Sequence, residues 1–373
     1  MISLDRHDLV HPDGRSFFLY GERVGSLVDQ PSEVSQAALH MRFDLSTRSW
    51  VAVSPARNQR PGGLATGEQT PTDGCPLCPH GVELPFDFDA AVFDNRFPSL
   101  VPDPPAVHGS LEGASVGRCQ VVVYTDAHQG SLATLALPEV ARVIAIWRDR
   151  STALWNEGFT YVMAFENRGP GVGATLSHPH GQLYAFGHTP PAVQTKSDAY
   201  QWHRLHEGSC LGCRLTTLDH DSERVVVAND SFTVAVPYAA RWPFEIHVRA
   251  RRHGCRRLGD LTTVEATDLA KAVRDVVARY DTLFGFELPY MMCMQEAPND
   301  ADDWHLHVEF LPPHRSPERL KVRASVETAL GVFINDTLPE VSAQHLASLN
   351  VEADDWSTVT VPEVTVKHPH ASV

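Results

Sequence analysis

Two histidines in the stretch SHPHGQ, residues 177–182, are the side chains of this sequence that most directly suggest chemistry. His178 and His180 flank a proline, which disfavours a helix, and residues i and i+2 of an extended segment point to one face. One ring can therefore be fixed as a metal ligand while the other stays free to react. We predict that His178 is the ligand and that His180 is a nucleophile toward phosphorus.

The residues around His180 favour a phosphate as the reacting group. Gly181 would allow a phosphate to approach the backbone, and the amide of Gln182 can donate to a phosphoryl oxygen. Residues 167–175 read NRGPGVGAT, a glycine-rich loop whose N–H groups could surround phosphates. The competing interpretation makes His180 a third metal ligand or a buried polar group. Residues i and i+2 of a strand rarely bind one ion together with a CxxC pair, which weighs against it.

A CxxC pair upstream supplies the remaining ligands for such a metal. Structural zinc sites take four nitrogen or sulfur ligands, and a CxxC knuckle presents two thiolates to one ion. A redox pair is the alternative, but such a pair usually opens a helix after a strand, whereas this one lies among Gly and Pro. The predicted zinc ligands are Cys75, Cys78, His128 and His178.

The second half of the chain repeats the order of the first: a CxxC pair, strands, a loop ending in His, a helix, a strand and His-x-His. The first half separates its CxxC, its loop His and its His-x-His by 50 and 50 residues, and the second half by 40 and 52. The repeat predicts a second, structural zinc site, unless its cysteines are free thiols left by a duplication. Its ligands would be Cys210, Cys213, His253 and His305.

Composition excludes several classes of protein. The 373 residues carry 31 basic and 46 acidic side chains, a formal charge of −15, which argues against a nucleic-acid binder. No secretory signal and no uninterrupted apolar run of about 18 residues is visible, so we expect no membrane partner. Seven cysteines with two CxxC pairs indicate a reducing compartment, and we predict a cytoplasmic protein. An anionic substrate would then need local positive charge, which Arg57 and Arg60 can supply.

The pattern of apolar residues predicts a duplicated α+β unit with mainly antiparallel sheets and flanking helices. Helices are expected over 137–158 and 261–285, and strands are expected around 50–53, 118–125, 159–169, 223–237, 244–251, 288–298 and 304–313. Residues 1–40 look irregular. The predicted divisions are an N-terminal half with the knuckle and His-Pro-His, a C-terminal half and a flexible tail, at residues 1–195, 196–345 and 346–373.

The stretch FENRGPGVGATLSHPHGQ, together with VSPARNQRP, CPLC, FDNRFP, PYAARWPFE and WHLHVEFLPPHRS, resembles the galactose-1-phosphate uridylyltransferases of the histidine triad superfamily. The resemblance covers about residues 40–345. It implies a ping-pong exchange in which UDP-glucose uridylylates His180 and releases glucose 1-phosphate. Galactose 1-phosphate then takes the UMP and leaves as UDP-galactose.

The resemblance also implies roles for further residues. Arg57 and Arg60 match a phosphate-binding pair, and Gln182 follows the nucleophile. The nucleotide would be bound by Asn95, Arg96, Phe97, Asn167, Gly173 and Thr175, and the hexose by Lys321, Glu327 and Asn335. In the family the arginine pair and the hexose positions come from the partner subunit, so a homodimer with shared active sites is implied.

The sequence departs from the family pattern at a few positions. Thr175 stands where another member has Ser, and Val326 where a Tyr contacts the sugar, which leaves hexose selectivity open. Some members bind iron in the second half. No iron is expected here, because those positions read Lys196, Gln295, His307 and Glu309. The sequence also allows a sister enzyme such as an ADP-glucose phosphorylase that uses the same histidine. His180 and the arginine pair argue against a non-catalytic zinc-ribbon interaction protein, which would need neither.

Overall fold

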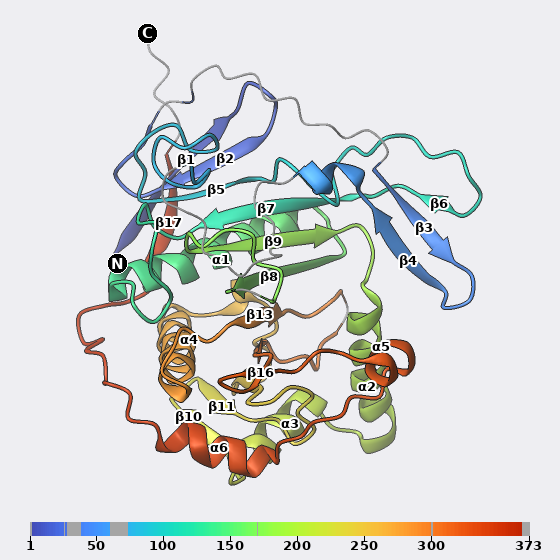
Figure 1. Cartoon of the computed structure of the whole chain (residues 1–373), viewed down its shortest axis with the longest axis vertical. Coiled ribbons are helices and arrows are strands. Elements are labelled where there is room, and N and C mark those ends of the chain that lie inside the picture. Colours follow the sequence, from blue (N-terminus) through green and yellow to red (C-terminus); the bar gives the residue numbers. More distant parts are fainter. Residues whose placement is uncertain are drawn as a thin grey trace.

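One twelve-stranded sheet runs through the whole molecule (Figure 1). The computed structural model describes residues 2–25, 27, 39–59, 74–169, 171–299 and 301–367. The strand order is β10-β11-β12-β14-β13-β8-β9-β7-β5-β2-β1-β17. The bounds are β1 (Ser3–Val10), β2 (Ser16–Tyr20), β5 (Ala90–Asp94), β7 (Gly117–Val123), β8 (Tyr161–Arg168), β9 (His180–Phe186), β10 (Val225–Ala228), β11 (Phe232–Ala235), β12 (Ile246–Ala250), β13 (Tyr290–Gln295), β14 (His307–Leu311) and β17 (Glu363–Lys367).

The two halves of the chain meet at the antiparallel pair β8–β13, where Tyr290 lies opposite Arg168 and Cys293 opposite Phe165. In this sheet only β1 and β17 pair in parallel among the described strands. Two small sheets lie apart from it, β4-β3-β6 and β15-β16. Their strands are β3 (His40–Asp44), β4 (Ser49–Val53), β6 (Glu112–Gly113), β15 (His314–Ser316) and β16 (Arg319–Leu320). The mainly antiparallel α+β fold predicted from the sequence is confirmed.

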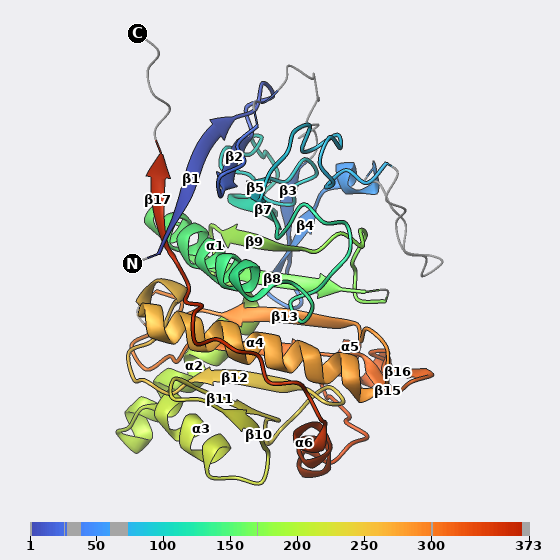
Figure 2. The ribbon, with the colours of Figure 1, turned by 90° about the vertical axis from the view of Figure 1, so that its left-hand side faces the viewer.

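Two long helices, α1 (Leu137–Asn156) and α4 (Thr263–Leu283), cover one face of the sheet (Figure 2). A proline in its first turn starts α1, and apolar residues at helical spacing bury the side that packs on the sheet. Thr262 caps α4 and forms a capping box with Glu265. The remaining helical elements are η1 (Pro55–Gln59), α2 (Pro191–Glu207), α3 (Leu211–His220), η2 (Leu258–Asp260), α5 (Ser325–Leu330) and α6 (Pro339–Ser348).

Both ends of the described chain are more ordered than their sequences suggest. Residues 3–10 and 16–20 form β1 and β2, so the expectation of an irregular N-terminal segment is wrong there. The expectation of a flexible tail is also wrong for residues 363–367, because β17 pairs with β1. The mainly polar sequences of β1 and β17 give only a weak strand signal, because backbone pairing rather than burial holds β17 at the sheet edge and β1 beside it.

Candidate active site

His180 is the first residue of β9, and a hydrogen bond to the backbone fixes its tautomer. Its Nδ1–H donates to the carbonyl oxygen of His178 at 2.7 Å. Nε2 is then the nitrogen that carries a lone pair. Burial lowers the pKa of His180, which keeps the ring neutral near pH 7. The ring lines a cavity of about 500 Å³, so a neutral, oriented imidazole is available to a bound substrate.

The cavity brings together residues that lie far apart in the sequence. Gln182 follows His180 on the same face of β9, because alternate residues of a strand share a face. The rest of the lining comes from residues 76–83, from the end of β5 and the turn after it, from β7 and from the loop before β9. The predicted residues that line it are Asn95, Arg96, Phe97, Thr175, His180 and Gln182. The turn after β5 is held by Asn95, whose Oδ1 accepts the backbone N–H of Phe97 at 2.8 Å.

Glu83 also lines this cavity, and no sequence signal singled it out. Its carboxylate accepts from Arg15 Nη1 at 2.7 Å and lies 3.7 Å from Arg96 Nη1. Arg15 in turn binds Asp13 at 2.9 Å. Arg15 and Glu83 lie 68 positions apart in the sequence. Their contact, and with it the position of the Glu83 carboxylate at the cavity, therefore arises only in the folded chain.

The glycine-rich loop before β9 depends on left-handed backbone at Gly169, Gly171 and Gly173, with φ of 82°, 83° and 87°. L-residues with a side chain rarely adopt such values. At Gly173 a β-carbon would also lie 3.5 Å from Asn167 Nδ2. The loop therefore positions Asn167 and Gly173 beside the segment that carries Thr175.

Gly181 has a different reason to be glycine from the one the sequence suggests. A β-carbon there would meet the hydroxyl of Tyr124 and would lie 3.0 Å from the carbonyl oxygen of Phe165. Gly181 alternates with His180 along β9, so it faces the core under α1 rather than the cavity. Close approach of a buried side chain, rather than of a phosphate, requires glycine at this position.

The first Cys/His cluster has the geometry of a closed N₂S₂ metal site. Its four ligand atoms, from Cys75, Cys78, His128 and His178, lie within 4.8 Å of one another. His178 Nε2–H donates to the carbonyl of Thr125 at 2.8 Å, which turns Nδ1 toward Cys78 Sγ, 3.5 Å away. His128 Nδ1 lies 3.2 Å from the same sulfur. This orienting bond to a ligand histidine is typical of zinc sites.

The chemistry of these donors also fits a cation. Burial, with a contribution from Cys75, raises the pKa of the Cys78 thiol to about 11 in the absence of a metal. The Cys78 thiol therefore does not ionise on its own at neutral pH, whereas a bound divalent ion deprotonates the thiols that coordinate it. The residues present fit zinc, which takes tetrahedral nitrogen and sulfur ligands.

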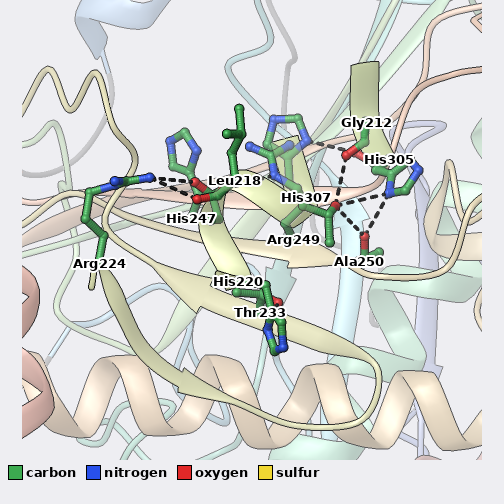
Figure 3. A network of polar contacts seen from close by, with 12 residues as sticks. Gly212, Leu218, His220, Arg224, Thr233, His247, Arg249, Ala250, His305 and His307 are labelled. Carbon is green, nitrogen blue, oxygen red and sulfur yellow. Dashed lines mark hydrogen bonds and ion pairs between the residues drawn. The ribbon is translucent and has the colours of Figure 1, made fainter. Parts of the chain in front are cut away.

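The second cluster repeats this arrangement in the C-terminal half. The ligand atoms of Cys210, Cys213, His253 and His305 also lie within 4.8 Å of one another. Figure 3 shows His305 directed by its Nδ1 hydrogen bond to the carbonyl of Ala250, at 2.9 Å. Its Nε2 lies 3.7 Å from Cys210 Sγ and 3.5 Å from Cys213 Sγ. A β-carbon at Gly212 would clash with the His305 ring, so glycine lets α3 approach it.

The histidine equivalent to His180 has a different environment. His307 Nδ1–H donates to the carbonyl of His305 at 2.9 Å, which reproduces the tautomer of His180. Its Nε2, however, lies 3.6 Å from Glu309 Oε1. Lys196 Nζ binds the same oxygen at 2.6 Å, and Gln295 Nε2 donates to the other carboxylate oxygen at 3.2 Å. These internal partners surround the second-half histidine, and His307 is not among the residues that line the cavity around His180.

Several predicted substrate residues do not reach the cavity of their own chain. Arg57, in η1, donates from Nη1 to Phe97 O at 3.3 Å and to Tyr184 Oη at 3.1 Å. Arg60 lies outside the described residues. Lys321 pairs with Glu327 at 2.6 Å.

Asn335, the third predicted hexose position, donates to Ala240 O at 3.0 Å. Lys321, Glu327 and Asn335 all lie within the described residues, and none of them lines the cavity around His180.

Among the described helices, none has the length and apolar character needed to cross a bilayer.

Comparison with known proteins identifies the family. The N- and C-terminal domains of galactose-1-phosphate uridyl transferase match residues 30–190 and 196–358. A galactose-1-phosphate uridylyltransferase of Thermotoga maritima is 38% identical over 324 residues, 84% of this chain and 99% of that protein. That of Rattus norvegicus is 31% identical over 341 residues, 83% of this chain and 87% of that protein.

Comparison with solved structures agrees with the sequence matches. A uridylyltransferase structure superposes with a TM-score of 0.73 at 29% identity, covering 83% of this chain and 98% of that one. An ADP-glucose phosphorylase from Arabidopsis thaliana has a TM-score of 0.64 at 22% identity, over 83% of this chain and 99% of that one, and it shares the fold. On the sequence matches and on this architecture, the chain belongs to the galactose-1-phosphate uridylyltransferase family.

Proposed function

We propose that this transferase exchanges UMP between UDP-glucose and galactose 1-phosphate through a covalent uridylyl group on His180. The observation that carries the proposal is the fixed tautomer of a neutral His180 whose ring lines the cavity. The names of the relatives supply the substrates. A histidine nucleophile forms a labile phosphoramidate, which divides one transfer into two easier steps.

In the first half-reaction, the lone pair of His180 Nε2 forms a bond to the α-phosphorus of UDP-glucose. The bond from that phosphorus to the bridging oxygen breaks, and glucose 1-phosphate leaves with the electron pair, so the chain supplies no proton. The Nδ1–H bond to His178 O stabilises the positive charge on the ring. Gln182 and Thr175 can donate to the phosphoryl oxygens. The second half-reaction reverses the step, with a phosphate oxygen of galactose 1-phosphate as the attacking atom.

Intact mass spectrometry tests this function. After incubation with UDP-glucose alone, one UMP per chain should appear on the protein, with release of an equal amount of glucose 1-phosphate. Galactose 1-phosphate should then remove the adduct and yield UDP-galactose. An adduct with AMP from ADP-glucose, and none from UDP-glucose, would instead assign the chain to the sister phosphorylase activity.

Zinc would be held by Cys75, Cys78, His128 and His178, and when bound it would supply structural rigidity rather than reaction chemistry. By holding His178, the site would fix the residue whose carbonyl orients His180. The same donor set supports a second structural zinc in the C-terminal half. We also propose a cytoplasmic location, since a reducing compartment keeps the cysteines of both clusters as thiols rather than disulfides.

The second zinc can be counted. The purified chain is expected to contain two zinc ions, and Cys210→Ser should lower the content to one because it removes a ligand from a closed four-ligand site. Cys293→Ser is the matched control, since Cys293 is free and belongs to neither cluster. Metal analysis of both variants decides the matter. A wild-type content of one zinc, unchanged in Cys210→Ser, would reject the second site.

A homodimer with shared active sites is proposed on two observations. Lys321, Glu327 and Asn335 do not line the cavity of their own chain. The same stretch of chain exposes many large apolar side chains, a feature of surfaces that pack against a partner. These side chains are Leu320, Val322, Val326, Leu330, Val332, Ile334, Leu338 and Val341.

Mixing two impaired variants tests both the role of the arginine pair and the proposed dimer. Charge-assisted bonds to phosphate contribute a few kcal/mol at most, so Arg57→Ala with Arg60→Ala should lower kcat/KM by roughly ten- to a thousandfold without unfolding the chain. Exchange of subunits with a His180→Gly chain should restore roughly a quarter of wild-type activity, because one site of each mixed dimer is complete. No restoration would mean that the arginines serve their own chain, and unchanged kinetics would exclude a phosphate-binding role.

A further inference from the structure

A buried polar group lies directly beneath the strand that carries His180. Tyr124 is 1% exposed, and its hydroxyl donates to Glu166 Oε2 at 2.9 Å. Tyr290, which is fully buried in β13, donates to the other oxygen of the same carboxylate at 2.8 Å. Glu166 thus takes one tyrosine hydroxyl from each half of the chain, across the β8–β13 junction.

Only one of the two tyrosines touches the segment around the nucleophile. The backbone N–H of Tyr124 donates to the carbonyl of Pro179 at 3.2 Å. Its hydroxyl occupies the space that a β-carbon of Gly181 would need. Tyr124 therefore contacts the residues immediately before and after His180, from the face of the sheet opposite the cavity. Its ring is packed edge-on against Trp147 of α1, with centroids 5.7 Å apart.

We propose that Tyr124, anchored by Glu166, is a positioning residue for the uridylyl transfer: it fixes the backbone at Pro179 and Gly181 and thereby aims His180 Nε2 at phosphorus. The Tyr124 hydroxyl already lies close to Gly181, which prevents it from moving further toward β9. The Glu166 carboxylate holds the same hydroxyl by a hydrogen bond. An in-line attack depends on such aim, since a displacement of about 1 Å reduces the rate by up to about a hundredfold. This inference rests on the proposed role of His180.

The two tyrosines provide a matched pair of variants. Tyr124→Phe and Tyr290→Phe each remove one hydroxyl from the same carboxylate, and both should lower stability to a similar extent. Only Tyr124→Phe should slow formation of the UMP adduct in a single turnover, by about tenfold with little change in KM, because only Tyr124 touches the backbone beside His180. Tyr290→Phe should stay within about twofold of the wild-type rate. Equal slowing by both variants, or no slowing by either, would overturn the proposal.

A second comparison uses the close contact at Gly181. Gly181→Ala should slow adduct formation by about a hundredfold, since the new methyl group displaces either Tyr124 or β9. Adding Tyr124→Phe removes the clashing oxygen and leaves the Phe165 carbonyl, at 3.0 Å, as the nearest atom. The double variant should therefore react faster than Gly181→Ala alone, and a rate no faster would overturn the proposal. A wild-type chain that forms no adduct would instead overturn the role of His180 itself, so the two failures are distinguishable.

Discussion

His180→Gly is expected to abolish UMP exchange, with a rate reduced by roughly ten thousandfold or more, because removal of a nucleophile eliminates the covalent route entirely. No UMP adduct should form on the variant in the presence of UDP-glucose. The fold should persist, since both metal clusters keep their ligands. Isotope exchange of labelled glucose 1-phosphate into UDP-glucose measures the loss directly.

The equivalent histidine of the second half provides the control. His307 has the same tautomer as His180, but Glu309 and Lys196 occupy its surroundings. His307→Gln should therefore still accept one UMP per chain. Exchange by His180→Gly at a rate near that of the wild type would show that the nucleophile has been assigned to the wrong residue.

Loss of the zinc proposed for the first cluster is expected to have the largest effect on stability. Cys78→Ser removes a sulfur that lies 3.2 Å from His128 Nδ1 and 3.5 Å from His178 Nδ1. Apparent binding free energies of structural zinc are on the order of 10 kcal/mol, comparable with the whole stability of a domain. The variant, or the wild type treated with a strong chelator, should thus unfold at a much lower temperature and lose transfer activity with the fold around His178.

Thermal unfolding followed by circular dichroism, with zinc content measured on the same samples, checks this expectation. Cys119→Ser is a suitable control, because Cys119 is a buried free thiol outside both clusters. An unchanged melting temperature and zinc content in Cys78→Ser would exclude a structural metal at this position.

The sequence predicts the residues of the metal clusters and of the reactive histidine better than it predicts the residues that surround them. The CxxC pairs and His-x-His motifs have spacings that chemistry demands, so each cluster could be assembled from the sequence, and the structure brings each set together. Helices and strands with strong apolar periodicity can be predicted from the sequence equally well, as α1 and α4 show. Both kinds of signal are local, or recur in the two halves.

Residues that act through long-range contacts carry no such signal. Arg15 holds Glu83 at the cavity, and Glu166 holds the Tyr124 hydroxyl against the strand that carries His180. Nothing near these residues in the sequence distinguishes them from ordinary core or surface positions. Gly181 shows the same limit: a glycine beside a reactive histidine suggests a phosphate, whereas the neighbour that requires it is a tyrosine 57 positions upstream.

The parallel pairing of β1 with β17 has a consequence for synthesis of the chain. Ser3 lies opposite Glu363, so β1 leaves the ribosome about 360 residues before β17, the strand that pairs with its outer edge. At about 5–20 residues per second, translation of the intervening chain takes roughly 20 to 70 s. Throughout this interval the outer edge of β1 presents unpaired backbone groups, which can bind a strand from a neighbouring nascent chain on the same messenger. Pairing of β1 with β17 of its own chain then covers this edge and removes the site of exchange between two molecules.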